Sequence, residues 1–333
     1  MTREPLRAAL GADPVSGRTV EVDGIRLAYD DEGQGPVVLC LHSIAHGASD
    51  YAPLRARLGS RCRVIALDWP GHGRSADDRV PASAARYAEI AERFADALGL
   101  RDVVLIGNSI GGAVAIRLAA KRPDVVRALV LADAGGLDRV DFMTRMVTRA
   151  MARFFAAGAR RAGWFPRAFA LYYGVVLSAS EADAQRARIV AASREMAPRL
   201  VEAWRSFGEP DADLRAAAAS LSCPVLVAWA KRDRVLQLWR SRPAIRRIPG
   251  ARLELFDGGH SPFLECPDAF AATLRGFLDG LPPVGADAAA ARSVSHDASF
   301  HAHSARSSAA SAGCGAPTGS ARWGEGSRDP SWD

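Results

Sequence analysis

The sequence predicts a protein of the α/β class, in which a mostly parallel sheet is covered on both faces by helices. Short, continuous runs of branched apolar residues alternate with stretches of helical spacing, which is the pattern of buried strands joined by crossover helices. One of these runs, residues 103–106, passes into a helix through a glycine-rich turn. Apolar residues make up 49% of the 333 positions, which is enough for a sizeable core.

A hairpin is expected at the start of the sheet. Residues 19–22 and 25–29 alternate in polarity and are joined through Asp23-Gly24, a dipeptide typical of two-residue hairpin turns. The strands expected after it are residues 37–41, 64–67, 103–106, 128–131, 224–230 and 253–256. Helical spacing covers residues 51–58, 87–98 and 111–122, and a last helix is expected through residues 263–277. Active-site residues should therefore gather where the parallel strands end.

The chain divides into four predicted parts. Residues 1–17 form an N-terminal extension, and residues 18–136 together with 216–282 form the α/β core. Residues 137–215 lack the strand pattern and are interpreted as a helical lid, rich in alanine and arginine. Residues 283–333 are dominated by Ala, Ser, Gly and Arg, so we expect a disordered, low-complexity tail that cannot bury enough surface to fold.

A wide apolar stripe marks the first helix of the expected lid. Its members are Phe142, Met143, Met146, Val147, Ala150, Met151 and Phe154. Arg145, Arg149 and Arg153 repeat every four residues on the other side. The position of the segment favours a mobile lid whose apolar face covers a substrate pocket. The alternatives are a basic amphipathic helix lying on a membrane and an ordinary packed helix with solvated arginines.

The charge pattern argues against several classes of partner. The net charge is +6, but the arginines are scattered and no lysine-rich run accompanies them, so no nucleic-acid surface is predicted. No apolar run reaches the ~20 residues that cross a bilayer, and residues 1–17 lack the apolar core of a signal peptide. We therefore expect a cytoplasmic protein without stable membrane insertion. His296, His301 and His303 cluster in the tail, where we interpret them as incidental rather than as a metal site.

The glycine-rich turn carries the pattern Gly-x-Ser-x-Gly, as Gly107, Ser109 and Gly111. A strand that enters a helix in so few residues must turn sharply, and glycines on either side remove the Cβ atoms that would clash. The serine at the apex is then exposed near the positive end of the helix dipole. This context predicts that Ser109 is a nucleophile whose attack creates an oxyanion.

A serine nucleophile needs a general base and a carboxylate that orients the base. His260 follows the last predicted strand and comes after Ser109 and the resumed strands, as the base does in sheets of this architecture. Asp233 follows the penultimate strand and is the favoured acid, with Asp133 the competitor and Asp257 a more remote choice. The predicted catalytic residues are therefore Ser109, Asp233 and His260.

The oxyanion of the predicted reaction needs two backbone N–H donors. Ile110, the residue after the nucleophile, supplies one of them. The loop after residues 37–41 should supply the other, through Ile44.

With these residues in place, the chain resembles a lid-bearing α/β-hydrolase over residues 18–281. The motifs that carry the resemblance are His42-Ser43-Ile44, Asp68-Trp69-Pro70-Gly71-His72-Gly73-Arg74-Ser75, the turn around Ser109, Arg232-Asp233, and Gly259-His260 before Pro262-Phe263. The resemblance implies the α/β-hydrolase fold, a Ser-Asp-His triad, and catalysis without a cofactor or a metal. Serine at position 109 distinguishes the chain from the haloalkane dehalogenase and epoxide hydrolase branches, which have an aspartate nucleophile.

Three positions bear on the substrate. The asparagine before the nucleophile, Asn108, is similar to the residue at that position in the hydrolases that cleave carbon–carbon bonds of ring-fission products. Those enzymes carry tryptophan after the catalytic histidine, where this chain has Ser261. Ser43 stands where most of the superfamily has glycine, and enol-lactone hydrolases carry an Asn-Ser pair in the same loop. The side chains expected to line the substrate pocket are His42, Ser43, Asn108, Phe142, Met146 and Trp164.

The sequence thus predicts a serine esterase that cleaves a small, partly apolar ester or lactone through an acyl-enzyme. A first alternative uses the same triad to cleave a carbon–carbon bond and would need a pocket arginine, for which Arg194 and Arg199 are candidates. A second is a receptor that binds a small ligand on the hydrolase fold without rapid turnover. The expected partner is a small molecule in each case, and no oligomeric state is predicted.

Overall fold

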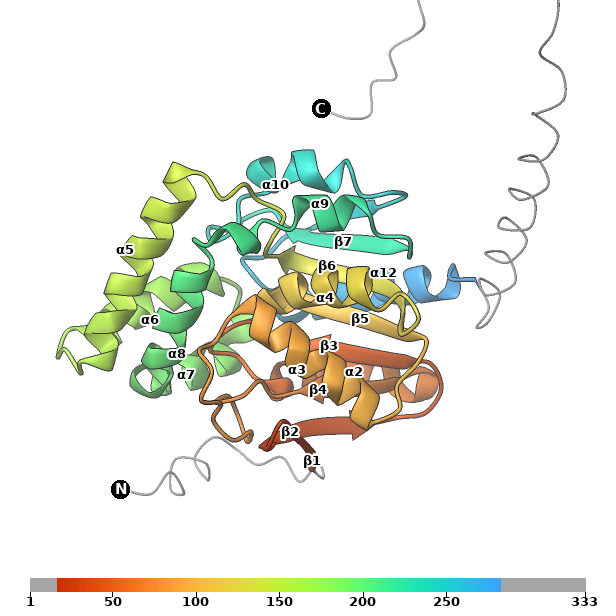
Figure 1. Ribbon diagram of the computed structural model, residues 1–333, viewed down its shortest axis with the longest axis horizontal. Coiled ribbons are helices and arrows are strands. Elements are labelled where there is room, and N and C mark those ends of the chain that lie inside the picture. The colour runs from red at the N-terminus through yellow and green to blue at the C-terminus, as the bar shows by residue number, and fades with distance from the viewer. Residues whose placement is uncertain (1–16, 283–333) are drawn as a thin grey trace, which may run out of the picture. The chain divides into compact units, whose positions relative to one another are not determined.

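Eight strands form one sheet in the computed structural model, which describes residues 17–282 (Figure 1). The strands are β1 (Arg18–Val22), β2 (Ile25–Glu32), β3 (Val37–Leu41), β4 (Arg63–Leu67), β5 (Val103–Ser109), β6 (Val126–Ala134), β7 (Val225–Ala230) and β8 (Arg252–Phe256). The helices are α2 (Ala52–Leu58), α3 (Ala84–Ala97), α4 (Ile110–Lys121), α5 (Phe142–Ala159), α6 (Phe165–Val176), α7 (Asp183–Ala191), α8 (Ser193–Ser206), α9 (Arg215–Ala219), α10 (Leu238–Ile245), α11 (Pro262–Glu265) and α12 (Pro267–Asp279).

The strand order confirms the predicted fold class. It runs β1-β2-β4-β3-β5-β6-β7-β8, with β1 and β2 antiparallel to their neighbours and the strands from β4 to β8 parallel. The turn between β1 and β2 has positive φ at both Asp23 (54°) and Gly24 (73°), as the predicted two-residue hairpin requires. Because the central strands are parallel, their carboxyl ends share one edge of the sheet.

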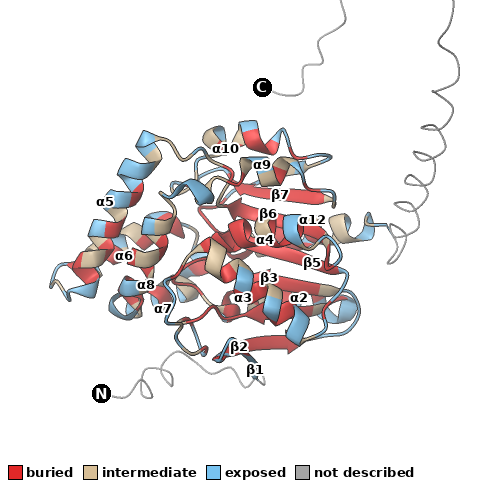
Figure 2. Ribbon diagram, in the orientation of Figure 1, coloured by how far each residue is buried: buried red, intermediate tan, exposed pale blue. Residues whose placement is uncertain are grey.

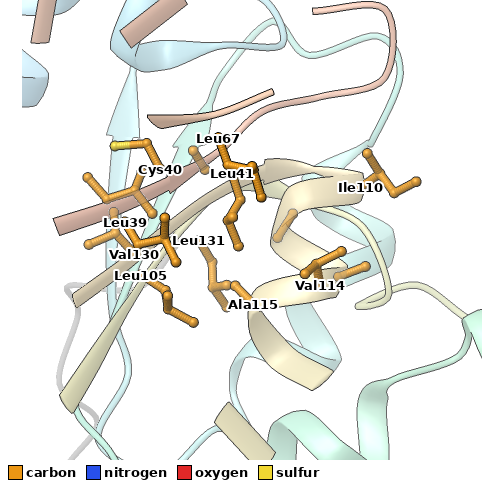
Figure 3. Packing of buried hydrophobic residues seen from close by; sticks show 14 of the residues in the cluster. Leu39, Cys40, Leu41, Leu67, Leu105, Ile110, Val114, Ala115, Val130 and Leu131 are labelled. Carbon is orange, nitrogen blue, oxygen red and sulfur yellow. The ribbon is translucent and has the colours of Figure 1, made fainter. Parts of the chain in front are cut away.

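Helices cover both faces of the sheet, and the strands are buried between them. In Figure 1, α3 and α4 lie in front of the sheet, and α2 packs against α12 behind it. Figure 2 shows the central strands almost uniformly buried, which explains their continuous apolar runs. Figure 3 shows the contact between these strands and α4, where Leu105, Leu131 and Ala115 are fully buried.

A helical insertion, α5 to α8, lies between β6 and β7 and is followed by the short helix α9. Its two ends meet, since the Leu214 amide donates to the Gly136 carbonyl over 2.9 Å. The insertion therefore leaves the sheet at the edge where the parallel strands end. Of the helices that the structure describes, none combines the length and the apolar character needed to span a bilayer. The predicted N-terminal extension (but for residue 17) and the tail with its three histidines lie outside the described residues.

The predicted last helix is two helices in the structure. The sequence spacing favoured one helix through residues 263–277, but α11 ends at Glu265 and α12 begins at Pro267. Cys266 between them has φ −133° and ψ 55°, because the residue before a proline is disfavoured in the helical region. The break turns the short helix α11 against the site described next.

Candidate active site

Ser109 lies at the turn between β5 and α4, as the sequence predicted. Its backbone has φ 55° and ψ −117°, a region that side-chain-bearing residues rarely adopt. The glycines make the turn possible: a Cβ on Gly107 would lie 2.3 Å from the Gly111 carbonyl oxygen, and one on Gly111 would lie 2.1 Å from the Leu41 carbonyl oxygen. The strained serine is thus held at the apex of a turn that only small residues can form.

His260 and Asp233 form a buried hydrogen-bonded pair at the same sheet edge. The Nδ1–H of His260 donates to Oδ2 of Asp233 over 2.9 Å. The other oxygen of Asp233 accepts from the amides of Val235 (2.7 Å) and Leu236 (3.0 Å), so the carboxylate has one orientation. A carboxylate on Nδ1 fixes the imidazole tautomer and leaves Nε2 as the proton acceptor.

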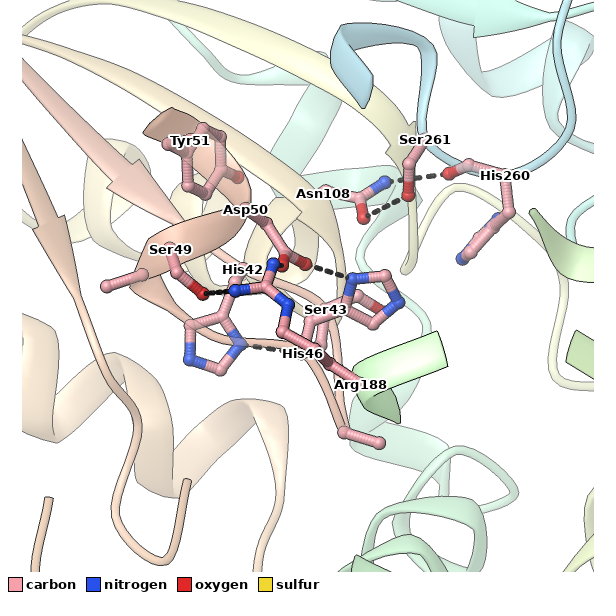
Figure 4. A network of polar contacts seen from close by, with 12 residues as sticks. His42, Ser43, His46, Ser49, Asp50, Tyr51, Asn108, Arg188, His260 and Ser261 are labelled. Carbon is pink, nitrogen blue, oxygen red and sulfur yellow. Dashed lines mark hydrogen bonds and ion pairs between the residues drawn. The ribbon is translucent and has the colours of Figure 1, made fainter. Parts of the chain in front are cut away.

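The loop that carries His260 is bonded to the residue before Ser109. The side-chain amide of Asn108 donates to the His260 carbonyl over 2.9 Å, and the Ser261 hydroxyl donates to Oδ1 of Asn108 over 3.1 Å (Figure 4). In the sequence analysis, Asn108 and Ser261 were two separate indications of the substrate class. In the structure they bind each other, so that two loops 152 residues apart meet one residue away from Ser109.

Glu265 is a residue beside the candidate site that the sequence analysis missed. Its buried carboxylate accepts from the amides of Gly259 (2.8 Å) and Ser261 (3.2 Å) on either side of His260. It also accepts from the amides of Ser178 (2.7 Å) and Ala179 (3.0 Å), just after α6. The His260 amide itself donates to the Val176 carbonyl over 2.8 Å. The helical insertion and the histidine loop are therefore joined through this carboxylate and through the His260–Val176 hydrogen bond. The signal that the sequence offered is an acid between Pro262 and Pro267, a few residues after His260.

Asp133, the competing acid of the sequence analysis, lies next to the Asp233–His260 pair. It is buried at the end of β6, and its Oδ1 accepts from the Ala230 amide over 2.9 Å. Its Oδ2 has no hydrogen-bond partner among the described residues. Burial, together with the nearby Asp233 carboxyl, raises the pKa of Asp133 well above its usual range. His260 is therefore paired with Asp233 and not with Asp133, whose neutral form is favoured by burial.

We expect Asp133→Asn to gain stability relative to the wild type as the pH rises above about 4. When the pKa of a carboxyl is higher in the folded chain than in the unfolded chain, its proton stabilises the folded state. This contribution is complete below the unfolded pKa, and about 1.4 kcal/mol of it is lost per pH unit as the pH rises toward the folded pKa. Asparagine has no such proton and still accepts from Ala230. Urea unfolding at pH 5 and pH 8 measures the difference; Asp257→Asn, at an exposed carboxyl, is the control. A difference that does not change with pH contradicts the assignment.

The two predicted oxyanion donors come from neighbouring strands. Ile44 lies in the loop after β3, Ile110 is the first residue of α4, and β3 pairs with β5 through Leu41 and Gly107. The Ile110 amide has no acceptor within its helix because it belongs to the first turn. The Ile44 amide donates to none of the residues that the structure describes. Both amides are thus available at this edge.

The loop that contains Ile44 is braced by histidines. His42 is fully buried, donates from Nδ1 to the Ser43 carbonyl over 2.6 Å, and accepts from the Trp69 amide at Nε2 over 3.1 Å. Burial lowers the pKa of His42 to about 3, so it is neutral. His42, Ser43 and Asn108, expected to line a pocket, are all buried, and both His42 and Asn108 use their polar groups inside the framework.

A second histidine–carboxylate pair joins the same loop to the insertion. The Nδ1–H of His46 donates to Oδ2 of Asp50 over 2.5 Å. Arg188 of α7 donates to Ser49 Oγ (2.9 Å) and to Oδ1 of Asp50 (3.4 Å), as Figure 4 shows. This network fixes α7 on the loop beside Ile44.

The structure does not bring the expected lid residues to the site. Phe142, Met146 and Trp164 are exposed, because α5 packs through another side of the helix, with Thr148, Ala152 and Phe155 buried. The candidate pocket arginines are also placed elsewhere. Arg194 is exposed, and Arg199 pairs with Glu202 over 2.7 Å.

Comparison with known proteins agrees with the fold. The model of the alpha/beta hydrolase family matches residues 38–273. A pimeloyl-[acyl-carrier protein] methyl ester esterase of Xanthomonas campestris is 32% identical over 257 residues, covering 75% of this chain and 98% of that protein. The uncharacterized protein Rv2715 of Mycobacterium tuberculosis is 28% identical over 82% of this chain and 84% of its own length. A thermophilic esterase structure from Thermogutta terrifontis superposes with a TM-score of 0.67, at 25% identity, over 79% of this chain and 98% of that chain.

Proposed function

The chain belongs to the alpha/beta hydrolase family, and from that premise we propose that it is a serine hydrolase of a small, partly apolar ester or lactone. The observation that carries the proposal is the His260–Asp233 pair, held by Asn108 one residue away from the strained Ser109. Two of the similar proteins are named as esterases, which supports an ester rather than a lactone as the substrate.

In the proposed reaction, the Ser109 hydroxyl attacks the carbonyl carbon of the substrate, and Nε2 of His260 takes its proton. The charge on the carbonyl oxygen is stabilised by the amides of Ile44 and Ile110, while Asp233 stabilises the imidazolium. The tetrahedral intermediate collapses, the C–O bond to the alcohol breaks, and His260 returns the proton to the leaving oxygen. Water then attacks the acyl-enzyme by the same route, releases the acid and restores Ser109.

Neither alternative is favoured by a specific contact. Cleavage of a carbon–carbon bond would call for an arginine facing the substrate, and both candidates are engaged elsewhere: Arg199 with Glu202, and Arg194 with solvent. A receptor without turnover would still need the pocket but not an activated nucleophile. The reactivity of Ser109 therefore separates the proposed enzyme from the receptor.

Labelling with a fluorophosphonate tests the proposal. We expect the native protein to be labelled at Ser109, identified by peptide mapping, and the label to be blocked by prior heat denaturation. His260→Gln should slow labelling by about 10³-fold or more, since the hydroxyl loses its general base. A panel of aryl esters and lactones run in parallel identifies the substrate class. Absence of label, or label on another serine, would overturn the proposed mechanism.

A further inference from the structure

The outward side of α5 carries an unusual group of exposed apolar side chains. Phe142 is 79% exposed, and Met143, Met146 and Val147 on the same helix are each exposed by 45% or more. Two tryptophans extend the group: Trp164 (55% exposed), whose ring lies 6.0 Å from that of Phe154 near the end of α5, and Trp239 (68%). Trp239 is close to the start of α5, because its neighbour Arg240 donates to Asp141 and to Thr144. We call these six residues and the arginines between them the α5 surface.

The α5 surface is strongly cationic. Between residues 142 and 180 the chain has six arginines and neither aspartate nor glutamate. They are Arg145, Arg149, Arg153, Arg160, Arg161 and Arg167, and all six are exposed. None of them forms an ion pair with a residue that the structure describes, whereas arginines of the core such as Arg63 and Arg86 are paired with carboxylates. The cations of this surface are thus available to an external partner.

The exposed apolar residues are not the packed side of the helix. α5 contacts α8, and its buried residues in the first three turns are Thr148 and Ala152. Helical spacing puts Phe142, Met146 and Arg149 together on the exposed arc that remains, so the expectation that the arginines lie on the side opposite the apolar stripe is wrong. A monomer rarely exposes so many large apolar side chains together without a partner for them.

We propose that the α5 surface binds the surface of an anionic lipid bilayer. Arginines beside Phe, Met and Trp side chains match a boundary at which phosphate groups adjoin hydrocarbon, where tryptophan is also favoured. A second copy of this chain fits less well, since a two-fold contact would bring two sets of unpaired arginines together. The sequence analysis kept such a membrane helix as an alternative to the pocket-facing lid, and the exposure of Phe142, Met143 and Met146 favours it.

Vesicle co-sedimentation of the full-length chain tests the proposal. The protein carries Ser109→Ala, so that no lipid turnover alters the vesicles and the result is independent of the proposed function. We expect binding to vesicles of equal parts phosphatidylglycerol and phosphatidylcholine, weakening as NaCl is raised, and little binding to phosphatidylcholine alone. Arg145→Glu with Arg149→Glu and Arg153→Glu should lower the partition coefficient by about 100-fold or more, since each arginine near an anionic surface contributes roughly a fivefold gain.

The matched control reverses the same number of charges elsewhere. Arg101, Arg246 and Arg247 are exposed and precede β5 and β8, at the sheet edge opposite the insertion. The triple exchange to glutamate there should lower binding much less. Phe142→Ser with Met146→Ser should also weaken binding, by about 10-fold or more, without changing the thermal unfolding temperature.

Three results would overturn the proposal: equal binding to neutral and anionic vesicles, equal effects of the two triple exchanges, or no binding by the parent protein. Light scattering tests the alternative that a second copy of the chain binds the α5 surface. If the parent is a dimer that the α5 triple exchange converts to a monomer, the surface is an interface between copies of the chain and not a bilayer site.

Discussion

Replacing Ser109 with alanine is expected to lower kcat on the best ester of the panel by about 10⁴-fold or more, with the fold retained. The hydroxyl oxygen forms the bond to the acyl group, and without it only the oxyanion donors and substrate binding remain. Alanine keeps the Cβ that already tolerates φ 55°, so the stability should change by less than about 1 kcal/mol.

Steady-state kinetics and thermal unfolding of the same preparations measure both quantities. Ser220→Ala, at an exposed serine before the amino end of β7 and thus at the opposite edge of the sheet from Asp233, is the matched control and should leave kcat unchanged. Activity that survives in the Ser109 variant at the wild-type level would mean that another group is the nucleophile.

Glu265→Ala should destabilise the protein by about 3 kcal/mol and lower kcat by about 100-fold. The substitution leaves the buried amides of Gly259 and Ser261 without an acceptor, at roughly 1–3 kcal/mol for each unsatisfied group. It also frees the loop that orients the His260 ring, so that kcat should fall more than KM rises.

The variant Glu265→Gln separates a loss of His260 orientation from a loss of folded protein. Glu265→Gln keeps one acceptor oxygen and replaces the other with a group that cannot accept, so we expect it to recover part of the stability and part of kcat. Measurements are made well below the unfolding temperature of each variant, with Glu254→Ala on the edge strand β8 as the control. Full activity in Glu265→Ala would show that His260 is held without this carboxylate.

Much of the core could be predicted from the sequence, because local patterns determine it. The glycines around Ser109 are required by close backbone approach, and the apolar runs of the central strands follow from burial on both faces. The positions of His260 and Asp233 followed from chain order, since parallel strands bring their ends to one edge.

The remaining features depend on contacts between distant segments. Nothing local distinguishes Glu265 from other acids near a helix start until its four amide donors from two segments are known. Likewise, an amphipathic pattern shows that a helix has two sides but not which one meets the body of the protein. For α5 this choice was decided by packing against α8, which the sequence spacing does not encode.

The hydrogen bonds around Val176, Ser178 and Ala179 have a consequence for engineering. Since these backbone groups bond to His260 and Glu265, the inserted helices are part of the frame that holds the imidazole. Chimaeras that exchange the whole segment with a relative would remove those supports together with the exposed residues of α5. A transplant limited to α5 and the first turns of α6 would leave them intact, and is the way to change the α5 surface while preserving the hydrogen bonds that hold His260.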